Sequence, residues 1–448
     1  MTALEELVSA LPDGRVLSDD DVMDAYRRDE ARLVKPGRPL AVVLPREAGD
    51  VQAVMRWATE HRVPVVPRGA GTGLSGGATA TDGCVVLSLA KMAEILEINA
   101  DEQLAVVQPG VVNADLQKAA SEHGLMYAPD PASFEISTIG GNIATNAGGL
   151  RCVKYGVTRE AVLGLEVVLA DGQLLKTGRR TVKGVAGYDL TSLFVGSEGT
   201  LGVVTSATVR LTPKPTSDPV TVVGVFDSLP AAGEAVNDVM RSGLRPSLLE
   251  LMDNATIRAI DDWKHVGLDR DAAAMLIGQF DADNARALAP RMENAFVDAG
   301  ATYTAVSSDA TEAAELIGIR RMTHWALERL GPILTEDVGV PRPRLAEMLL
   351  RIEQIAGEFD VVIATVGHAG DGNLHPSLVV DNERAWPAAE AIYQAALQMG
   401  GTITGEHGVG VLKRDWLPAE AGELGMAVQR SIKAALDPLG ILNPGKAI

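Results

Sequence analysis

Residues 67–78 read PRGAGTGLSGGA, with five glycines in the nine positions from Gly69 to Gly77. Because glycine lacks a Cβ, such a segment can adopt positive φ angles and let the backbone approach a ligand closely. Successive backbone N–H groups in a glycine-rich loop form a concave site for anions. We therefore expect this segment, with Arg68 nearby, to hold phosphate.

The same run contains a G-x-G-x-x-G pattern from Gly71 to Gly76. A dinucleotide-binding Rossmann turn would also need a helix that begins at the third glycine and an acidic residue about 20 positions on. Residues 77–83 are poor in helix formers, and the residue 20 after Gly71 is Lys91. No Gly-Lys-Ser/Thr follows, so a Walker loop is excluded as well.

Two more glycine-rich segments follow, IGGNIATNAGG at 139–149 and GSEGTLG at 196–202. Any one of the three segments could be an ordinary tight turn, since a lone glycine motif is a weak signal. Three of them in the first half of the chain favour one elongated ligand that lies across several loops.

Alternating patterns divide the chain into two parts. Strands are expected at 40–46 and 63–67, with a helix at 50–61 that begins at an aspartate cap, Asp50, between them. Pro213-Lys-Pro215 ends this part, and from 220 to 400 strands alternate with longer helices, which indicates a separate α/β or α+β unit.

Composition excludes several classes of protein. The 448 residues include 40 basic and 59 acidic ones, a net charge of −19, so the overall field repels nucleic acid and anionic lipid. Cys84 and Cys152 stand alone, which argues against disulfide scaffolds, iron–sulfur clusters and Cys-rich zinc sites. The acidic N-terminus does not resemble a signal peptide and no apolar run is long enough to span a bilayer, so we expect a cytoplasmic protein.

The glycine segments, with Pro129-Asp-Pro131 between them, resemble in order and spacing the FAD-binding domain of the vanillyl-alcohol oxidase and p-cresol methylhydroxylase (PCMH) superfamily. Later motifs resemble the branch of glycolate oxidase flavin subunits, D-lactate dehydrogenases and D-2-hydroxyglutarate dehydrogenases: GHAGDGNLH at 367–375, GEHGVG at 405–410 and LNPGK at 442–446. The resemblance covers the chain from about residue 35 onward.

The resemblance implies an α+β fold in three parts: a two-subdomain PCMH-type FAD-binding domain at 1–215, an α/β cap domain for substrate at 216–404, and a C-terminal helical segment at 405–448 that returns to the FAD domain. FAD would be bound without a covalent link, because no His or Cys occurs in 67–78. Its pyrophosphate, ribityl–flavin and adenine parts would meet the three glycine segments in turn. The implied contacts are Pro67, Arg68, Gly69, Ala70, Gly71, Thr72, Gly73, Leu74, Ser75, Gly76, Pro131, Thr138, Gly140, Gly141, Asn142, Thr145, Asn146, Gly148, Gly149, Gly156, Glu198, Gly202, Val203 and Asn443.

Three of the seven histidines fall within forty residues of one another, at His368, His375 and His407. The glycines between the first two cannot sustain a helix, so we expect a turn that folds back and brings both imidazoles together. With Glu406 they would form a two-nitrogen, one-carboxylate set for Zn²⁺, or alternatively Mn²⁺, with an open position. The alternative is structural histidines in a glycine-rich turn; the family resemblance favours the metal.

His407 is the candidate general base, because a neutral imidazole can take the hydroxyl proton as the hydrogen on Cα passes to flavin. The alternatives are a third metal-binding histidine or a buried, hydrogen-bonded one. The resemblance places a substrate arginine at Arg320; His324 would share its helix face, and Arg342 is a second candidate.

The proposed reaction is metal-assisted, FAD-dependent oxidation of a D-2-hydroxy acid to the 2-oxo acid. Hydroxyglutarate-specific members carry Lys and Asn where this chain has Thr335 and Ser377, which favours D-lactate or glycolate over D-2-hydroxyglutarate. Two further functions stay open from the sequence: an alkyl transferase with the same FAD domain, and a non-catalytic flavin subunit.

The expected partners are a small 2-hydroxy acid and an electron acceptor that the sequence does not identify. Quinone, an electron-transfer flavoprotein, an iron–sulfur subunit and O₂ all remain open as acceptors. We expect no nucleic acid and no direct membrane insertion, with peripheral attachment only through a partner. A homodimer is also left open.

Overall fold

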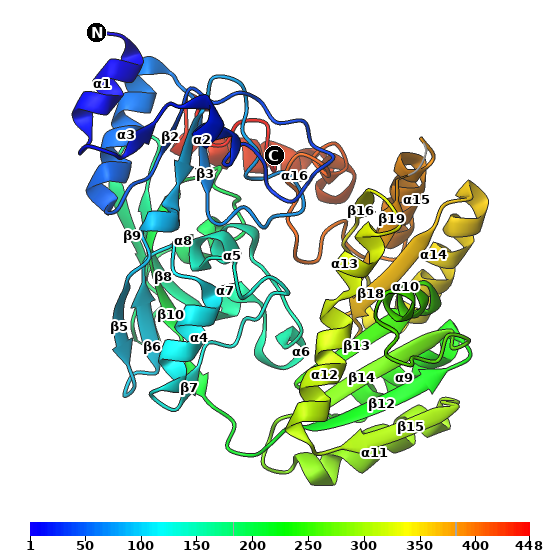
Figure 1. The fold of residues 1–448 in the computed structure, drawn as a ribbon. Coiled ribbons are helices and arrows are strands. Elements are labelled where there is room, and N and C mark those ends of the chain that lie inside the picture. The colour runs from blue at the N-terminus through cyan, green and yellow to red at the C-terminus, as the bar shows by residue number, and fades with distance from the viewer. Residues whose placement is uncertain (182, 381–382) are drawn as a thin grey trace. The chain divides into compact units, whose positions relative to one another are not determined.

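The computed structural model describes residues 1–181, 183–380 and 383–448. The chain forms two compact units, one made of residues 1–148, 156–214 and 406–448 and the other of 149–155 and 215–405 (Figure 1). The first unit contains the three glycine segments, except for Gly149 at the end of the second, and is called the FAD unit below. The second is called the cap unit.

One sheet of the FAD unit is built around three parallel strands. Its order is β1-β2-β4-β3, in which β2 and β3 both run parallel to β4, and β1 pairs antiparallel with β2. Helix α3 makes the crossover from β2 to β3. The elements are α1 (Ala3–Ala10), β1 (Val16–Leu17), α2 (Asp20–Asp24), β2 (Ala41–Val43), α3 (Ala48–His61), β3 (Val65–Arg68) and β4 (Val85–Ser88).

Both faces of this sheet are buried, as continuous apolar strands require. Val43, Val65 and Val85 pack with α1 and α3 on one face. The alternate residues Val42 and Val66 pack on the other face with Met23 of α2. The two-residue period of the strands thus assigns each valine to one of two cores.

The second sheet of the FAD unit is antiparallel, in the order β5-β6-β10-β8-β9. The Asp171-Gly172 pair joins β8 to β9, as the sequence predicts, and Gly172 has a φ of 80°. The elements are η1 (Leu89–Lys91), β5 (Ile95–Asn99), β6 (Leu104–Val107), α4 (Asn113–Ser121), β7 (Leu125–Met126), α5 (Ile139–Thr145), α7 (Thr158–Ala161), β8 (Val162–Val168), β9 (Leu174–Gly178), α8 (Leu190–Phe194), β10 (Val203–Arg210) and β11 (Thr212–Pro213).

The C-terminal segment completes the FAD unit through helix α16 (Leu417–Leu436) and the residues after it. Leu442 pairs with Val65 of β3, so the chain end lies along the first sheet (Figure 1). The Asn443 amide donates to the carbonyls of Gly77 and Glu198, and the buried Lys446 ammonium donates to the carbonyl of Gly76 at 2.9 Å. This tail therefore ties two of the three glycine segments together.

The cap unit is an antiparallel sheet in the order β15-β12-β14-β13-β18-β19-β16, with β17 also paired to β19. Helices α9 and α11 each connect strands that run parallel with one antiparallel strand between them, the split βαβ arrangement. The elements are α6 (Cys152–Tyr155), β12 (Val220–Phe226), α9 (Leu229–Arg241), β13 (Leu248–Asp253), α10 (Asn254–Lys264), β14 (Ala274–Phe280), α11 (Ala285–Asp298), β15 (Tyr303–Ser307), α12 (Ala310–Arg321), α13 (Thr323–Glu328), β16 (Ile333–Thr335), β17 (Val338–Gly339), η2 (Arg342–Arg344), α14 (Leu345–Phe359), β18 (Ile363–His368), β19 (Asn373–Val379) and α15 (Ala385–Gln398).

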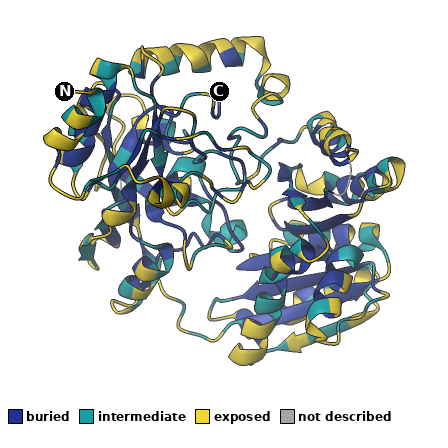
Figure 2. Cartoon of the chain, turned by 45° about the horizontal axis from the view of Figure 1, so that its top comes forward, coloured by how far each residue is buried: buried dark blue, intermediate teal, exposed yellow. Residues whose placement is uncertain are grey.

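Helices cover both faces of the cap sheet, and the strands are its most buried part (Figure 2). Val223 and Val225 of β12 pack with residues of α10, α12 and α13. Phe226 meets Phe296 of α11 edge-on, with ring centroids 6.0 Å apart. Across the described residues, every helix is too short or too polar to span a bilayer.

Two local details differ from the sequence predictions. Asp50 does not cap α3: the cap position is Glu47, and the buried Asp50 carboxylate instead accepts from Arg15 Nε at 3.1 Å and from the Arg46 N–H at 2.9 Å. The cap sheet pairs antiparallel throughout its described ladders, so α+β describes it better than α/β.

Glu198, in the third glycine segment, is buried and accepts hydrogen bonds from the backbone N–H groups of Val409 and Gly410 at 2.7 and 2.9 Å. Burial raises the pKa of its carboxyl from 4.5 to about 7, although those N–H groups and the cations of Lys446 and Lys413 act in the opposite direction. A carboxyl whose pKa is raised on folding stabilises the folded state below its unfolded pKa, and this stabilisation is lost as the pH rises through the folded pKa.

We predict that ionisation of Glu198 lowers the stability of the folded protein as the pH rises from about 4.5 to about 7, and that Glu198→Gln removes this contribution. The amide cannot titrate, so the stability of the wild type relative to the variant should fall as the pH rises. The temperature of flavin release, measured against pH, tests this. The exposed Glu122→Gln is the control; a difference for Glu198→Gln that stays constant with pH would contradict the prediction.

Candidate active site

The first glycine segment begins at the end of β3 and is closely packed against its own arginine. Gly71 has a φ of 82°, and a Cβ on it would lie 2.0 Å from Nη2 of Arg68. Arg68 is itself buried and donates to the carbonyl of Arg28 at 2.6 Å. Gly71 therefore needs both its positive φ and its missing side chain.

The second glycine segment forms α5 and packs against the first. Thr138 caps this helix, and a Cβ on Gly69 would lie 2.5 Å from its Oγ1. The buried Asn142 accepts from Asn113 and donates to Ser137, so its amide supports the helix rather than facing outward. The two loops thus pack directly against each other at Gly69 and Thr138.

A cavity of about 450 Å³ borders the first glycine segment. Gly71, Thr72 and three arginines, Arg28, Arg32 and Arg68, contribute to its lining, together with the acidic Asp29 and Glu30. Backbone N–H groups with arginines suit a dianionic pyrophosphate, because charge-assisted hydrogen bonds to phosphate are strong and Arg binds it in a bidentate manner. The residues present therefore fit FAD, whose pyrophosphate this surface would hold.

Not every residue expected at the cofactor has a free side chain. The Glu198 carboxylate and the Asn443 amide both hold backbone groups of the FAD unit, as described above. Gly149 belongs to the cap unit, together with the short helix α6, whose Tyr155 donates to Asp281 at 2.7 Å. The chain therefore leaves the FAD unit and enters the cap unit within the loop that follows α5.

Glu406 and His407 lie in the FAD unit beside the glycine segments. A Cβ on Gly148 would lie 2.2 Å from Oε2 of Glu406. Ser75 of the first loop donates to the carbonyls of His407 and Gly408 at 3.3 and 2.8 Å. The candidate base is therefore held through its backbone, and its imidazole Nε2 is 3.6 Å from Oε1 of Glu406.

His368 and His375 meet in the cap unit at the hairpin of β18 and β19. His368 ends β18, and the turn at Gly372, with a φ of 77°, leads into β19, which carries His375. Their ring centroids are 5.1 Å apart with planes at 81°, and their ligand nitrogens lie within 4.8 Å. The predicted turn that brings the two imidazoles together is present.

Each of these imidazoles has a buried carboxylate at its Nδ1 atom. Glu250 Oε1 is 2.8 Å from His368 Nδ1, and Asp337 Oδ1 is 3.5 Å from His375 Nδ1. The carboxylate hydrogen-bonded to Nδ1 of His368 favours the tautomer that carries its proton there, which leaves the lone pair of Nε2 for a metal. The donor set within the cap unit therefore fits two ligands of a divalent ion.

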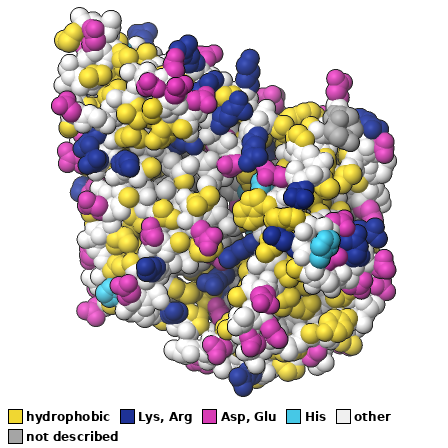
Figure 3. Space-filling view, in the orientation of Figure 1, with side chains coloured by type: hydrophobic (Ala, Val, Ile, Leu, Met, Phe, Trp, Pro, Cys, Tyr) yellow, Lys and Arg dark blue, Asp and Glu magenta, His cyan; other side chains and the backbone are white. Residues whose placement is uncertain are grey.

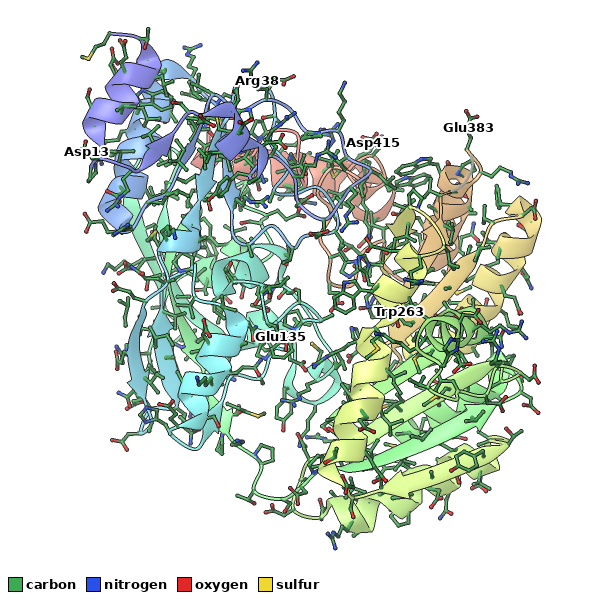
Figure 4. All side chains as sticks on the ribbon, viewed as in Figure 1. Asp13, Arg38, Glu135, Trp263, Glu383 and Asp415 are labelled. Atoms are coloured by element: carbon green, nitrogen blue, oxygen red, sulfur yellow. The ribbon has the colours of Figure 1, made fainter. Side chains whose placement is uncertain are left out.

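Arg320 is buried at the end of α12 and pairs with the same Glu250, Nε to Oε2, at 3.0 Å. Burial opposes ionisation of Glu250, but His368 and Arg320 outweigh it and lower its pKa. The ion pair between Arg38, labelled in Figure 4, and Asp20 is exposed to solvent, unlike that of Arg320 with Glu250. Solvated ion pairs of this kind contribute little to stability.

The other two candidates for substrate binding, His324 and Arg342, lie at the surface of the cap unit. Helix α12 ends at Arg321 and α13 begins at Thr323, and His324 is partly exposed with its Nε2 3.5 Å from Glu328. Arg342 is exposed, but its backbone borders the turn at Gly372. Basic and acidic side chains are interspersed on the face in view (Figure 3).

Sequence reasoning missed Glu250 and Asp337. Both are fully enclosed acids, 2% and 0% exposed, and Asp337 also accepts from Asn373 at 2.7 Å and Thr404 at 2.8 Å. The available signal was an acidic residue inside the apolar strand LLELMD, which needs a buried partner. The sequence does not identify that partner, because it lies on another strand.

The fold and loops define a flavoprotein of the PCMH type. Residues 39–178 match the model of the FAD binding domain, and residues 215–447 match that of the FAD linked oxidases, C-terminal domain. The chain belongs to the FAD-linked oxidases.

Relatives agree over nearly the whole chain. Glycolate oxidase subunit GlcD of Bacillus subtilis is 44% identical over 91% of this chain and 88% of its own. D-lactate dehydrogenase of Archaeoglobus fulgidus is 38% identical over 95% and 96%, and D-2-hydroxyglutarate dehydrogenase of Stutzerimonas stutzeri 34% over 99% and 98%. The structure of p-cresol methylhydroxylase has the same fold, with a TM-score of 0.81 and 18% identity over 99% of this chain and 96% of that one.

We predict that Gly71→Ala lowers the FAD content of the purified protein about tenfold or more, equivalent to about 1.4 kcal/mol of binding. Its Cβ would meet the buried Arg68 guanidinium, which cannot move without releasing Arg28. Gly83→Ala is the matched control, because Gly83 has a φ of 71° but open space around it. It should cost about 1 kcal/mol of stability and retain flavin; equal flavin loss in both variants would contradict a close-packing role.

Proposed function

We propose that this enzyme oxidises a D-2-hydroxy acid to the 2-oxo acid, using FAD and a divalent metal, with D-lactate or glycolate as substrate. The observation that carries this is the hairpin pair His368 and His375, each with a carboxylate at Nδ1, next to the buried Arg320. Relatives named glycolate oxidase subunit and D-lactate dehydrogenase support the substrate class.

The proposed metal ligands are Nε2 of His368 and His375 and the carboxylate of Glu406. Glu406 directly follows Gly405, which packs against Asn373 at the start of β19. Chain connectivity would thus bring the carboxylate to the hairpin in the proposed site. Two imidazoles and one carboxylate with an open position are typical of a catalytic Zn²⁺ site, and Mn²⁺ is the alternative ion.

When bound, FAD supplies the two-electron acceptor and the metal lowers the pKa of the substrate hydroxyl. Arg320 would bind the substrate carboxylate, since its guanidinium is a planar fork of donors and only its Nε is assigned to Glu250 above. His407 would accept the hydroxyl proton as the carbon loses its hydrogen. Ser75 holds the backbone of His407, so the base keeps its place beside the cofactor loops.

A hydroxyl pair in the cap unit supports a monocarboxylate substrate. Thr335 and Ser377 face each other across β16 and β19, and their hydroxyl oxygens are 3.1 Å apart. Neither carries a charge that would bind a second carboxylate. D-2-hydroxyglutarate is the second candidate, which the 34% identical relative named for that activity favours.

We predict that one D-2-hydroxy acid bleaches the visible flavin band of the anaerobic protein, and that a chelator abolishes the bleaching. The panel is D- and L-lactate, glycolate, D-malate and D-2-hydroxyglutarate, each with and without chelator and with Zn²⁺ or Mn²⁺ added back. Bleaching that survives chelation would overturn the metal. A flavin that no 2-hydroxy acid bleaches would overturn the substrate class.

We predict that His407→Asn lowers the rate of bleaching by about 10²- to 10⁴-fold, the usual contribution of a general base. FAD should stay bound, because the contact with Ser75 uses the carbonyl of residue 407, not its imidazole. Stopped-flow absorbance measures the rate, and the exposed His123→Asn is the control. Loss of flavin, or an unchanged rate, would be inconsistent with the proposed role.

A further inference from the structure

We propose that Glu250 is a positioning residue that couples the metal site to the substrate anchor by holding His368 and Arg320 at once. This inference rests on the proposed function. In this proposal Glu250 touches neither substrate nor flavin. It orients two groups that bind ligands, His368 for the metal and Arg320 for the substrate.

The position of Glu250 follows from strand register. Glu250 of β13 stands opposite His368 of β18 in the antiparallel ladder, so their side chains share one face of the cap sheet. The partner arginine reaches the same carboxylate from α12. One oxygen is 2.8 Å from His368 Nδ1 and the other is 3.0 Å from Arg320 Nε, while the side chain of Glu250 is 2% exposed.

Each oxygen of the carboxylate therefore faces a different neighbour: Oε1 is hydrogen-bonded to His368, whereas Oε2 forms an ion pair with Arg320 that lacks hydrogen-bond geometry. A carboxylate offers acceptors only, whereas an amide of the same shape offers one acceptor and one NH₂ donor. The Arg320 Nε always carries its proton. If His368 is to bind a metal through Nε2, its Nδ1 must carry a proton too, so both neighbours of Glu250 are donors.

A purely structural ion pair is the competing explanation. Buried ion pairs contribute little net stability, because desolvation offsets the attraction between their charges. A structural role would make removal of Glu250 destabilising without any specific effect on metal affinity. A positioning role makes metal affinity and substrate binding change together while the fold remains intact.

The first test is zinc affinity of Glu250→Gln, measured by competition with a chromophoric chelator on the flavin-loaded protein. The amide can accept from His368 or face Arg320 favourably, but not both, so zinc should bind about 10- to 100-fold more weakly. The KM for the bleaching hydroxy acid should rise as well. Asp253→Asn is the control: it removes a carboxylate from the same strand that accepts from Thr256 and Thr365, and should leave zinc affinity unchanged.

The second test is a double-mutant cycle with Arg320→Leu. In the Arg320→Leu background no guanidinium faces the amide that Glu250→Gln introduces, so the amide oxygen can accept from His368. The loss of zinc affinity caused by Glu250→Gln should therefore be at least about fivefold smaller in this background than in the wild type. Contacts that act as a unit are non-additive in this way. Strict additivity, or zinc affinity of Glu250→Gln within about twofold of wild type, would overturn the coupling.

Wild-type protein provides a readout that needs no substitution at Glu250. In zinc-loaded protein, ¹⁵N shifts of labelled histidines should show His368 with its proton on Nδ1, assigned by comparison with His368→Gln. A proton on Nε2 would overturn the inference even if Glu250→Gln fails to fold. Absence of zinc binding by wild type would overturn the metal of the proposed function and this inference together, whereas zinc binding without an effect of Glu250→Gln would overturn the inference alone.

Discussion

A buried carboxylate needs hydrogen-bond donors or cationic partners, and this constraint applies in both units of the protein. In the FAD unit, Glu198 gathers the backbone N–H groups of Val409 and Gly410. In the cap unit, Glu250 gathers an imidazole and a guanidinium. Each of these acids joins segments that lie far apart in the chain. Apolar packing forms the sheets, while Glu198 joins two loops of the FAD unit and Glu250 joins two strands to helix α12 of the cap unit.

Local features of both units could be predicted from the sequence, because glycine positions and strand periods are local signals. The 67–78 segment, the hairpin at Asp171-Gly172 and the fold-back between His368 and His375 depend on residues close in the chain. The family also followed from such motifs, and the matches over residues 39–178 and 215–447 support it. The conformational preferences of neighbouring residues were sufficient to predict these features.

The remaining features depend on partners that are distant in the chain. Asp50 reads as a helix cap, yet its carboxylate is bound by Arg15 from another segment. The antiparallel cap sheet was not evident, because its helix crossovers connect strands that are not neighbours. Glu250 and His368 are 118 residues apart, and only strand register shows that they pair. Sequence patterns give the residues of the candidate site but not the contacts that orient them.

The bond from Lys446 to the carbonyl of Gly76 spans 370 residues of chain. A loop held by so distant a segment can take its final form only after residues 441–447 have been synthesised. Contacts of such long range also close slowly, since the entropy of the intervening chain has to be overcome first. Flavin loading would then be a late step in the maturation of this protein, after the cap strands have been synthesised.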